Sequence, residues 1–158
     1  MNNEFLNIDC MEYMKSMKNN SINMTLTDIP YGAVTRETNG LSKLSNLDSL
    51  GSADKVTFDE LKFCKEVLRV TKGIIIIFCG KEQFSTIFNF FAGQKGTTRA
   101  LVWEKTNPVP SNGKYVYLSG IELAVWFKKS GYYIFNAFCK NTVFKYPIPN
   151  GGRRLHKT

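Results

Sequence analysis

The sequence contains few of the residues that carry hydrolytic, redox or metal chemistry. The 158-residue chain has one histidine, His156, close to its end, and four cysteines without a Cys-x-x-Cys pair. The sequence therefore offers no suitable set of residues for a zinc site, a redox dithiol or a Ser-His-Asp triad. Because each cysteine lies among apolar residues, we expect small buried hydrophobes rather than a disulfide framework. These scarcities exclude most hydrolytic mechanisms and predict that no metal is bound.

Long apolar runs and an excess of acidic residues are also absent. No apolar run approaches the roughly 20 residues that a membrane helix needs. The N-terminus lacks the basic start and apolar run of a secretory signal. The chain has 13 Asp and Glu against 21 Lys and Arg, a net charge of +8. We expect a single cytoplasmic domain with no membrane partner, and an acidic partner, nucleic acid first. A solvated lysine-rich surface would explain the same charge equally well.

Apolar periodicity predicts alternating strands and helices over most of the chain. Strands are expected at residues 4–9, 22–27, 74–79, 98–104 and 120–128, with a further candidate at 132–138. Helices are expected at residues 11–18, from 57 onward and at 82–91, the second starting with a capping box of Thr57 and Glu60. Strands that alternate with helices are typical of a parallel α/β sheet. We therefore predict an α/β fold with an antiparallel hairpin at its C-terminal edge.

Two stretches lack this periodicity. Residues 32–56 form a long segment without a helix or strand pattern. Segments longer than about 12–15 residues without secondary structure are usually functional lids or disordered. Residues 145–158 are polar and rich in glycine and proline, and we expect them to form a tail.

The most informative segment is Asp28-Ile29-Pro30-Tyr31, which directly follows a predicted strand. In open α/β sheets, ligands bind outside the carboxyl ends of the strands. An exocyclic amino group on a base is a poor nucleophile, because its lone pair is delocalised into the ring. The Asp28 carboxylate and a backbone carbonyl beside Pro30 could accept its two hydrogens and localise that lone pair. Tyr31 could stack on an extruded base, worth about 1–3 kcal/mol. An ordinary turn after a strand would use the same residues.

Nearly the whole chain resembles the DNA amino-methyltransferases of the permuted, β-type class. The resemblance runs in the family's order through FLNIDCMEYMKSMKNNSINMTLTDIPYG, TFDELKFCKEVLRVTKGIIIIFCGKEQF, LVWEKTNPVPSNGKYVYLSGIELAVWFKK and the terminal LHKT. It implies an incomplete Rossmann-like fold. It also implies an enzyme that uses S-adenosylmethionine as its cofactor and acts on double-stranded DNA. The methyl group would go to the amino group of adenine, or less readily of cytosine. The host would be a bacterium or a phage, with restriction-modification as one setting.

The catalytic motif of this family, (Asp/Asn/Ser)-Pro-Pro-Tyr, matches Asp28, Pro30 and Tyr31, while Ile29 departs from its first proline. The resemblance also implies a set of cofactor-contacting residues, namely Asp9, Cys10, Asp28, His156 and Lys157. For Asp9 a helix cap is an almost equal alternative.

The resemblance implies that two loops contact DNA. Residues 32–56 match a mobile loop that closes over cofactor and DNA, and a second loop near the DNA follows residue 104. The implied DNA contacts are Arg36, Lys43, Lys55, Lys105, Asn107, Asn112 and Lys114. Surface solvation and plain turn formation are the alternatives for these residues.

One departure from the family concerns the cofactor. The Phe-x-Gly-x-Gly turn that holds the methionine end of S-adenosylmethionine has no counterpart among the 12 glycines. We therefore expect the chain to be about two-thirds of a methyltransferase domain, inactive alone and with weak or no cofactor binding. The strand at 4–9 would lack a neighbour, and an exposed sheet edge would favour homodimers. The alternative function is that of a non-catalytic remnant that binds nucleic acid. An RNA or protein methyltransferase is disfavoured by the order of the motifs.

Overall fold

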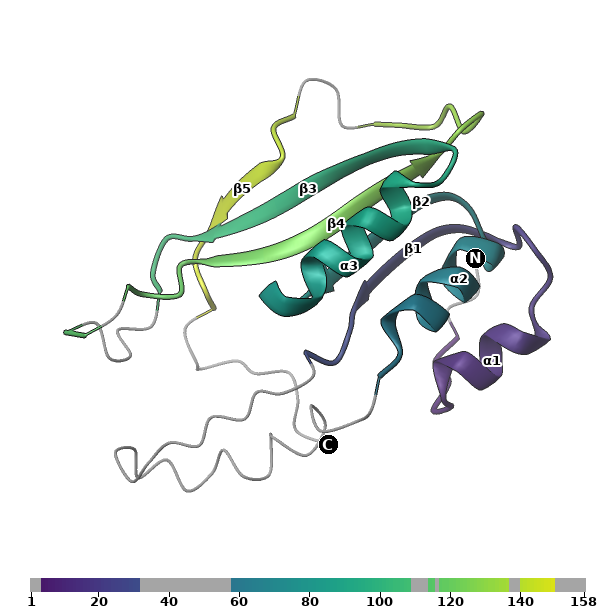
Figure 1. Cartoon of the computed structure of the whole chain (residues 1–158), viewed down its shortest axis with the longest axis horizontal. Helices are drawn as coiled ribbons and strands as arrows, with labels where there is room; N and C mark the ends of the chain where they lie inside the picture. Colours follow the sequence, from purple (N-terminus) through teal and green to yellow (C-terminus); the bar gives the residue numbers. More distant parts are fainter. Residues whose placement is uncertain (1–3, 32–57, 109–113, 116, 137–139, 150–158) are drawn as a thin grey trace.

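The computed structural model describes residues 4–31, 58–108, 114–115, 117–136 and 140–149 (Figure 1). Its helices are α1 (Cys10–Ser16), α2 (Glu60–Val70) and α3 (Lys81–Ala92). Its strands are β1 (Ile22–Asp28), β2 (Thr71–Cys79), β3 (Gly96–Lys105), β4 (Ile121–Lys129) and β5 (Val143–Tyr146). No helix in these described segments is both long and apolar enough to cross a membrane.

The five strands form one mixed sheet in the order β1-β2-β4-β3-β5. Strands β1 and β2 are parallel, as are β3 and β5, whereas β4 runs antiparallel to both β2 and β3. The predicted α/β fold with an antiparallel hairpin is thus confirmed, and the hairpin of β3 and β4 joins the sheet through β4 beside β2.

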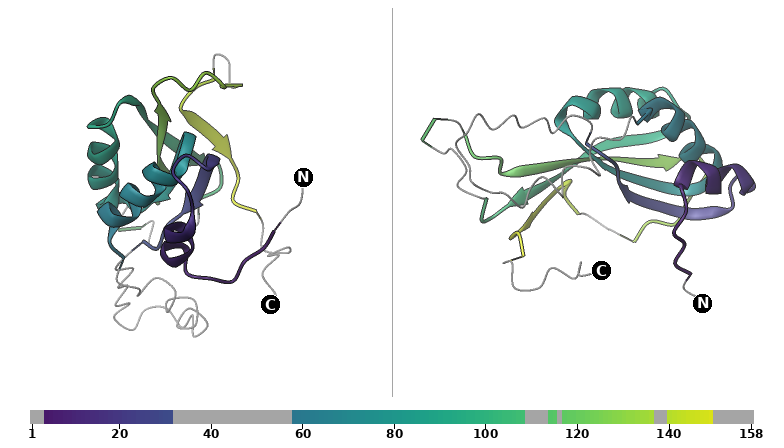
Figure 2. Two further views of the ribbon diagram at one scale, coloured as in Figure 1. Left: turned by 90° about the vertical axis from the view of Figure 1, so that its right-hand side faces the viewer. Right: turned by 90° about the horizontal axis from the view of Figure 1, so that it is seen from below.

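All three helices lie on one face of the sheet (Figure 2). In β2 every second side chain points to that face, and Ile75 and Ile77 are fully buried there. They pack with Val67 of α2 and Ile87 of α3, and the Phe91 and Phe127 rings lie 5.1 Å apart between centroids. This continuous apolar layer is the core, and we call this side of the sheet the covered face.

Helix α1 is attached to α2 by one arginine. The guanidinium of Arg69 donates from Nη2 to the Met14 carbonyl at 2.6 Å and from Nη1 to the Met17 carbonyl at 2.8 Å. These two carbonyls lie at the C-terminal end of α1, where backbone acceptors need partners from outside the regular helix, and that of Met14 also accepts from the Met17 N–H at 3.0 Å. Arg69 therefore closes α1 and fixes its position over the sheet.

The strand predicted at residues 4–9 is wrong. These residues form no strand, and Phe5 is 96% exposed. An isolated strand cannot satisfy its backbone hydrogen-bonding groups, and none of the described strands lies beside this one. The apolar residues Phe5, Leu6 and Ile8 therefore resemble a strand in sequence but have no neighbouring strand to pair with.

The predicted start of the second helix is also displaced. Helix α2 begins at Glu60, and the Asp59 carboxylate caps it by accepting a hydrogen bond from the Lys62 backbone N–H at 2.9 Å. Glu60 is thus the first helical residue, so it cannot be the third residue of a capping box. Thr57 lies outside the described residues.

The C-terminal edge differs from the prediction as well. Residues 132–136 form no strand, and the edge is occupied by β5, which starts before the expected tail at residue 145. The Trp103 indole N–H donates to the Tyr146 carbonyl at 3.0 Å and helps to attach β5 to β3. The polar tail was therefore predicted too early. The loop expected to be mobile, residues 32–56, lies outside the described residues.

Candidate active site at the carboxyl ends of the strands

Strand β1 ends at the residue that the sequence singled out. Asp28 pairs in register with Phe78 of the parallel strand β2, so the carboxyl ends of these two neighbouring strands lie together at one end of the sheet. A cleft of about 400 Å³ opens there. Its lining residues are Asp28, Tyr31, Phe78, Trp103 and Glu122. This is where an open α/β sheet is expected to bind its ligand.

Asp28 and Tyr31 both line this cleft. Asp28 is exposed, whereas Tyr31 is partly buried. Burial and the nearby Asp28 carboxylate together raise the pKa of Tyr31 well above its usual value of 10.0. Tyr31 is therefore neutral at physiological pH, beside an exposed carboxylate that can accept hydrogen bonds from a ligand.

The backbone between these two residues is held from both sides. The Ile29 N–H donates to the Phe78 carbonyl at 3.2 Å, and the Pro30 carbonyl accepts from Gln83 Nε2 at 2.9 Å. The Ile29 side chain is buried in the core, with 4% exposed. A proline at this position would lack the N–H that bonds to Phe78. Isoleucine therefore adds an anchor at the position where the family's motif has its first proline.

Sequence reasoning missed three residues here: Gln83, Trp103 and Glu122. Trp103 and Glu122 are register partners on β3 and β4 and line the same cleft. A charged residue at the start of an otherwise apolar strand was the signal for Glu122. Gln83 gave a weaker signal, because a glutamine three residues after Gly80 is typical of an ordinary helix start.

Lys105 lies beside the cleft. Its ammonium group forms an ion pair with Glu122 and lies 5.8 Å from the centroid of the Trp103 ring. Its side chain is 12% exposed. Lys105 therefore contacts two residues that line the cleft, and its contact with DNA stays a prediction.

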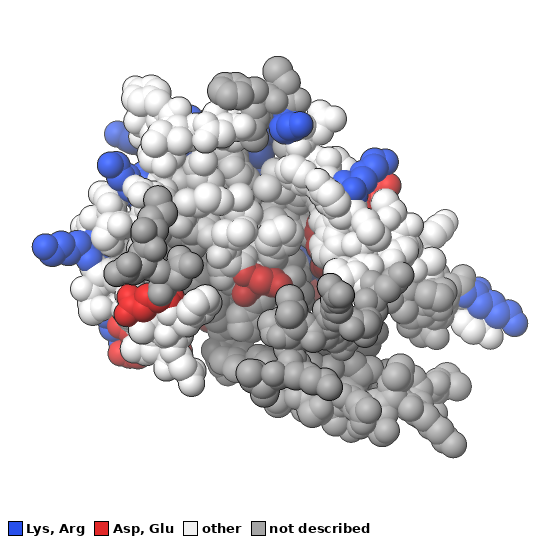
Figure 3. All heavy atoms as spheres, turned by 180° about the vertical axis from the view of Figure 1, so that it is seen from behind, with Lys and Arg blue, Asp and Glu red and all other residues white. Residues whose placement is uncertain are grey.

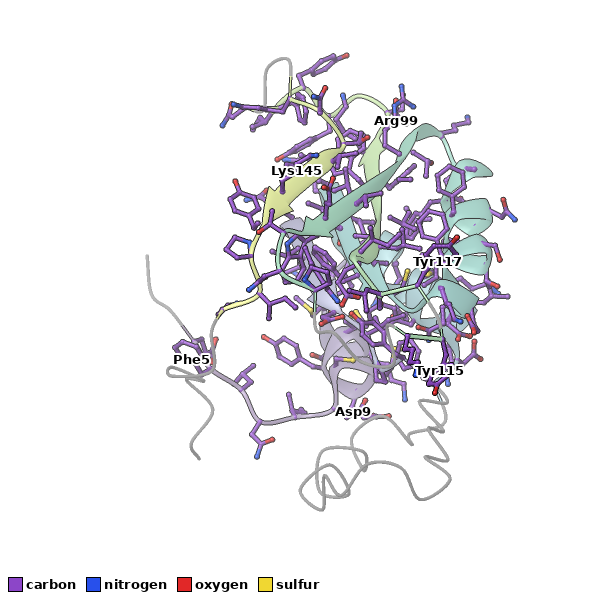
Figure 4. All side chains as sticks on the ribbon, turned by 90° about the vertical axis from the view of Figure 1, so that its left-hand side faces the viewer. Phe5, Asp9, Arg99, Tyr115, Tyr117 and Lys145 are labelled. Atoms are coloured by element: carbon purple, nitrogen blue, oxygen red, sulfur yellow. The ribbon has the colours of Figure 1, made fainter. Side chains whose placement is uncertain are left out.

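The other predicted DNA contacts fall into two groups. The Asn107 amide donates to the Ile148 carbonyl at 3.0 Å and accepts from the Ile148 N–H at 2.5 Å, so it fixes the segment after β5. Lys114 is exposed, with its ammonium group 5.7 Å from the centroid of the Tyr115 ring (Figure 4). The remaining predicted contacts, Arg36, Lys43, Lys55 and Asn112, lie outside the described residues.

Two of the predicted cofactor residues, Asp9 and Cys10, lie at the start of α1. Asp9 Oδ1 accepts from the backbone N–H groups of Met11 at 2.8 Å and Glu12 at 3.0 Å, at the start of α1 (Figure 4). Asp9 thus caps a helix and does not end a strand. Cys10 is exposed, contrary to the expectation of a buried hydrophobe, whereas Cys64 and Cys79 are buried. His156 and Lys157 lie outside the described residues.

Comparisons with known proteins found a matching family model and a related protein. A family model described as DNA methylase matches residues 22–150. The type II methyltransferase M.HinfI of Haemophilus influenzae is 30% identical over 146 residues, which are 80% of this chain and 39% of that protein. The chain thus spans well under half of that relative.

Two solved structures have a similar fold. A complex of M1.HpyAVI with SAM has a TM-score of 0.54 at 20% identity, covering 87% of this chain and 60% of the other. The cytosine-N4-specific PvuII DNA methyltransferase has a TM-score of 0.61 at 14% identity, covering 92% of this chain and 57% of the other. At these identities the likeness shows the incomplete Rossmann-like fold.

Proposed function

Since this chain belongs to the DNA methylase family, we propose that it is the catalytic part of a site-specific DNA methyltransferase. The supporting observation is that Asp28 and Tyr31 line the same cleft at the end of β1. The proposed substrate is double-stranded DNA in which one base is flipped out, and the reaction methylates the exocyclic amino group of that base.

The described residues supply the groups that hold the base. The Asp28 carboxylate accepts one amino hydrogen, and a backbone carbonyl beside Pro30 accepts the other. The rings of Tyr31 and Trp103 provide flat apolar walls, and base–aromatic stacking is worth about 1–3 kcal/mol per base. These two hydrogen bonds localise the lone pair on the amino nitrogen before the methyl group is transferred. When the nitrogen gains the methyl group it loses one proton, and Asp28 is the proposed acceptor.

The cofactor is the second part of the proposal. S-adenosylmethionine supplies an electrophilic methyl group bound to a sulfonium sulfur. The described residues do not fit this cofactor by themselves, since the Asp9 carboxylate already caps α1. We therefore expect this 158-residue chain to bind S-adenosylmethionine weakly or not at all. Titration calorimetry tests this expectation, and micromolar affinity would contradict it.

Catalysis is tested in a version of the protein extended to include a Phe-x-Gly-x-Gly turn. Methylation of double-stranded DNA is expected, and Asp28→Ala should reduce it by about 1,000-fold or more, since one positioned acceptor is lost. Glu12→Gln removes a carboxylate from an exposed ion pair of α1 and is the matched control, expected to leave the rate unchanged. Full activity of Asp28→Ala would overturn the catalytic assignment.

The target base is proposed to be adenine. An Asp at the first position of the motif favours adenine, whereas the PvuII enzyme with a similar fold is cytosine-N4-specific. Mass spectrometry of nucleosides from the methylated DNA distinguishes N6-methyladenine from N4-methylcytosine. N4-methylcytosine would correct the proposal without changing the reaction class.

A nucleic-acid-binding remnant is the second candidate function, supported by the net charge of +8. The exposed Asp28 carboxylate in the cleft favours the catalytic proposal at this site, because it can accept a hydrogen from a base amino group and does not bind phosphate. Salt-dependent DNA binding without methylation by the extended protein would favour the remnant. A cytoplasmic setting, a role in restriction-modification and a homodimer formed through an exposed sheet edge remain part of the proposal.

A further inference from the structure

The parallel ladder between β1 and β2 stops one hydrogen bond early. Asp28 pairs with Phe78, and the Ile29 N–H still donates to the Phe78 carbonyl at 3.2 Å. In a parallel ladder, a residue that donates in this way accepts in return from the residue two positions further along the partner strand. The Ile29 carbonyl would therefore accept from the Gly80 N–H, but the register ends at Asp28.

The Gly80 N–H, which would have completed this bond, donates to the Gln83 side chain instead. The Gly80 N–H donates to Gln83 Oε1 at 3.0 Å, and Gln83 Nε2 donates to the Pro30 carbonyl at 2.9 Å. The same nitrogen donates to Glu60 Oε1 at 3.1 Å. Only 6% of Gln83 is exposed, so both ends of its amide are committed to these partners.

We propose that Gln83 is a positioning residue which keeps the Ile29 carbonyl out of the β-ladder and available to the amino group of the target base. This assignment rests on the proposed function and identifies the backbone carbonyl that acts with Asp28. Two bonds, at the Ile29 N–H and at the Pro30 carbonyl, hold the Ile29–Pro30 peptide from either side. The acceptor is therefore preorganised before the base enters, and small misplacements of such groups cost about 100-fold in rate.

Other side chains could not do the same at this place. Glutamate could accept from Gly80, but it could not donate to the Pro30 carbonyl, and its charge would face Glu60. Methionine has a similar length but forms neither bond. Gln83→Met therefore removes the clamp, and Gln83→Glu removes only the donating half.

The hydrogen-bond change can be measured without catalysis. In the isotopically labelled chain, through-hydrogen-bond NMR coupling between the Gly80 amide nitrogen and the Ile29 carbonyl carbon should be absent. It should appear in Gln83→Met, because Gly80 then completes the ladder. Gln94→Met, which removes another side-chain bond to a backbone carbonyl at the end of α3, should leave the Gly80 signals unchanged. Coupling in the wild type, or its absence in a folded Gln83→Met, would overturn the proposal.

Kinetics of the extended, active protein provide the second test. Gln83→Met should lower kcat by about 10- to 100-fold and leave KM for DNA within about twofold, since positioning is lost and binding is kept. Gln83→Glu should keep the Gly80 bond and show an intermediate kcat. An unchanged kcat in Gln83→Met would refute the positioning role. A wild type that does not methylate DNA would instead refute the proposed function, while the NMR result still decides where Gly80 bonds.

Discussion

The two faces of the sheet differ sharply in how they are packed. On the covered face, Ile75 and Ile77 of β2 are fully buried beneath α2 and α3. On the opposite face, which we call the open face, Leu26 of β1 is 63% exposed. Figure 3 shows this side of the molecule, where uncharged groups dominate the centre and most Lys and Arg side chains lie toward the margin. The same strands thus have one face that is buried in the core and one face that remains accessible.

The open face and the candidate active site are continuous. An apolar hollow of about 350 Å³ on the open face is lined by Leu26, Ile76, Phe78, Leu101, Trp103, Phe144 and Tyr146. Phe78 and Trp103 also line the cleft that contains Asp28. The comparison shows that stability comes from the covered face, whereas the residues that can meet a ligand belong to the open face and its edge.

The largest expected difference between the two faces is in the cost of removing a phenyl ring. Phe91→Ala should lower the free energy of unfolding by about 3–5 kcal/mol, because the ring is fully buried beside Phe127. The matched change on the open face, Phe144→Ala, should cost about 1 kcal/mol or less, since Phe144 is exposed. Urea denaturation monitored by circular dichroism measures both. Equal costs would mean that the open face is as well packed as the covered face.

A smaller change in the free energy of unfolding should appear at alkaline pH. Burial raises the pKa of Cys64 from 9.0 to about 12, and burial together with the charge of Asp28 raises that of Cys79 to about 11. Above pH 9, and below these raised pKa values, the two thiols are ionised in the unfolded chain but stay neutral in the folded chain. Stability is therefore retained below pH 9 and lost as the pH rises, by about 1 kcal/mol per thiol at pH 10. Urea midpoints at pH 8 and pH 10 measure the loss, and Cys64→Ala should reduce it; an unchanged loss would show that Cys64 does not contribute.

A further expected difference concerns ion pairs. Lys105→Met should cost about 1–2 kcal/mol, because it leaves Glu122 without its partner in the partly enclosed cleft wall. The control is Lys145→Met, which breaks a bridge to Glu104 of 3.0 Å whose lysine side chain is 65% exposed, and it should cost under about 0.5 kcal/mol. Thermal denaturation compares them. The reverse order of the two costs would show that Lys105 is not held in the cleft wall.

Local patterns predicted the elements of the covered face well. The alternation in residues 22–27 and the apolar run at 74–79 correspond to β1 and β2, and the helix expected at 82–91 corresponds to α3. These predictions hold because burial on one or both faces leaves a periodic signal in the sequence. Residues 4–9 carry the same signal without forming a strand, since a strand also requires a neighbour that no local pattern reveals.

The site was predicted in part. Asp28, Pro30 and Tyr31 lie close together in the chain, so their motif could be read from the sequence, and Asp28 and Tyr31 line a cleft. Gln83 and Glu122 are far from them in the chain, and only register and helix packing bring them to the same edge.

The sequence by itself determined the α/β class, the family resemblance and the end of β1 as the place of the candidate site. Each of these depends on a local pattern or on the order of motifs. Only the tertiary structure decided which backbone groups remain available there. Gln83 removes the Gly80 N–H from the ladder, and Lys105 is paired with Glu122 rather than exposed. Such choices depend on hydrogen-bond partners that are distant in the chain, or on side-chain positions that no periodicity encodes.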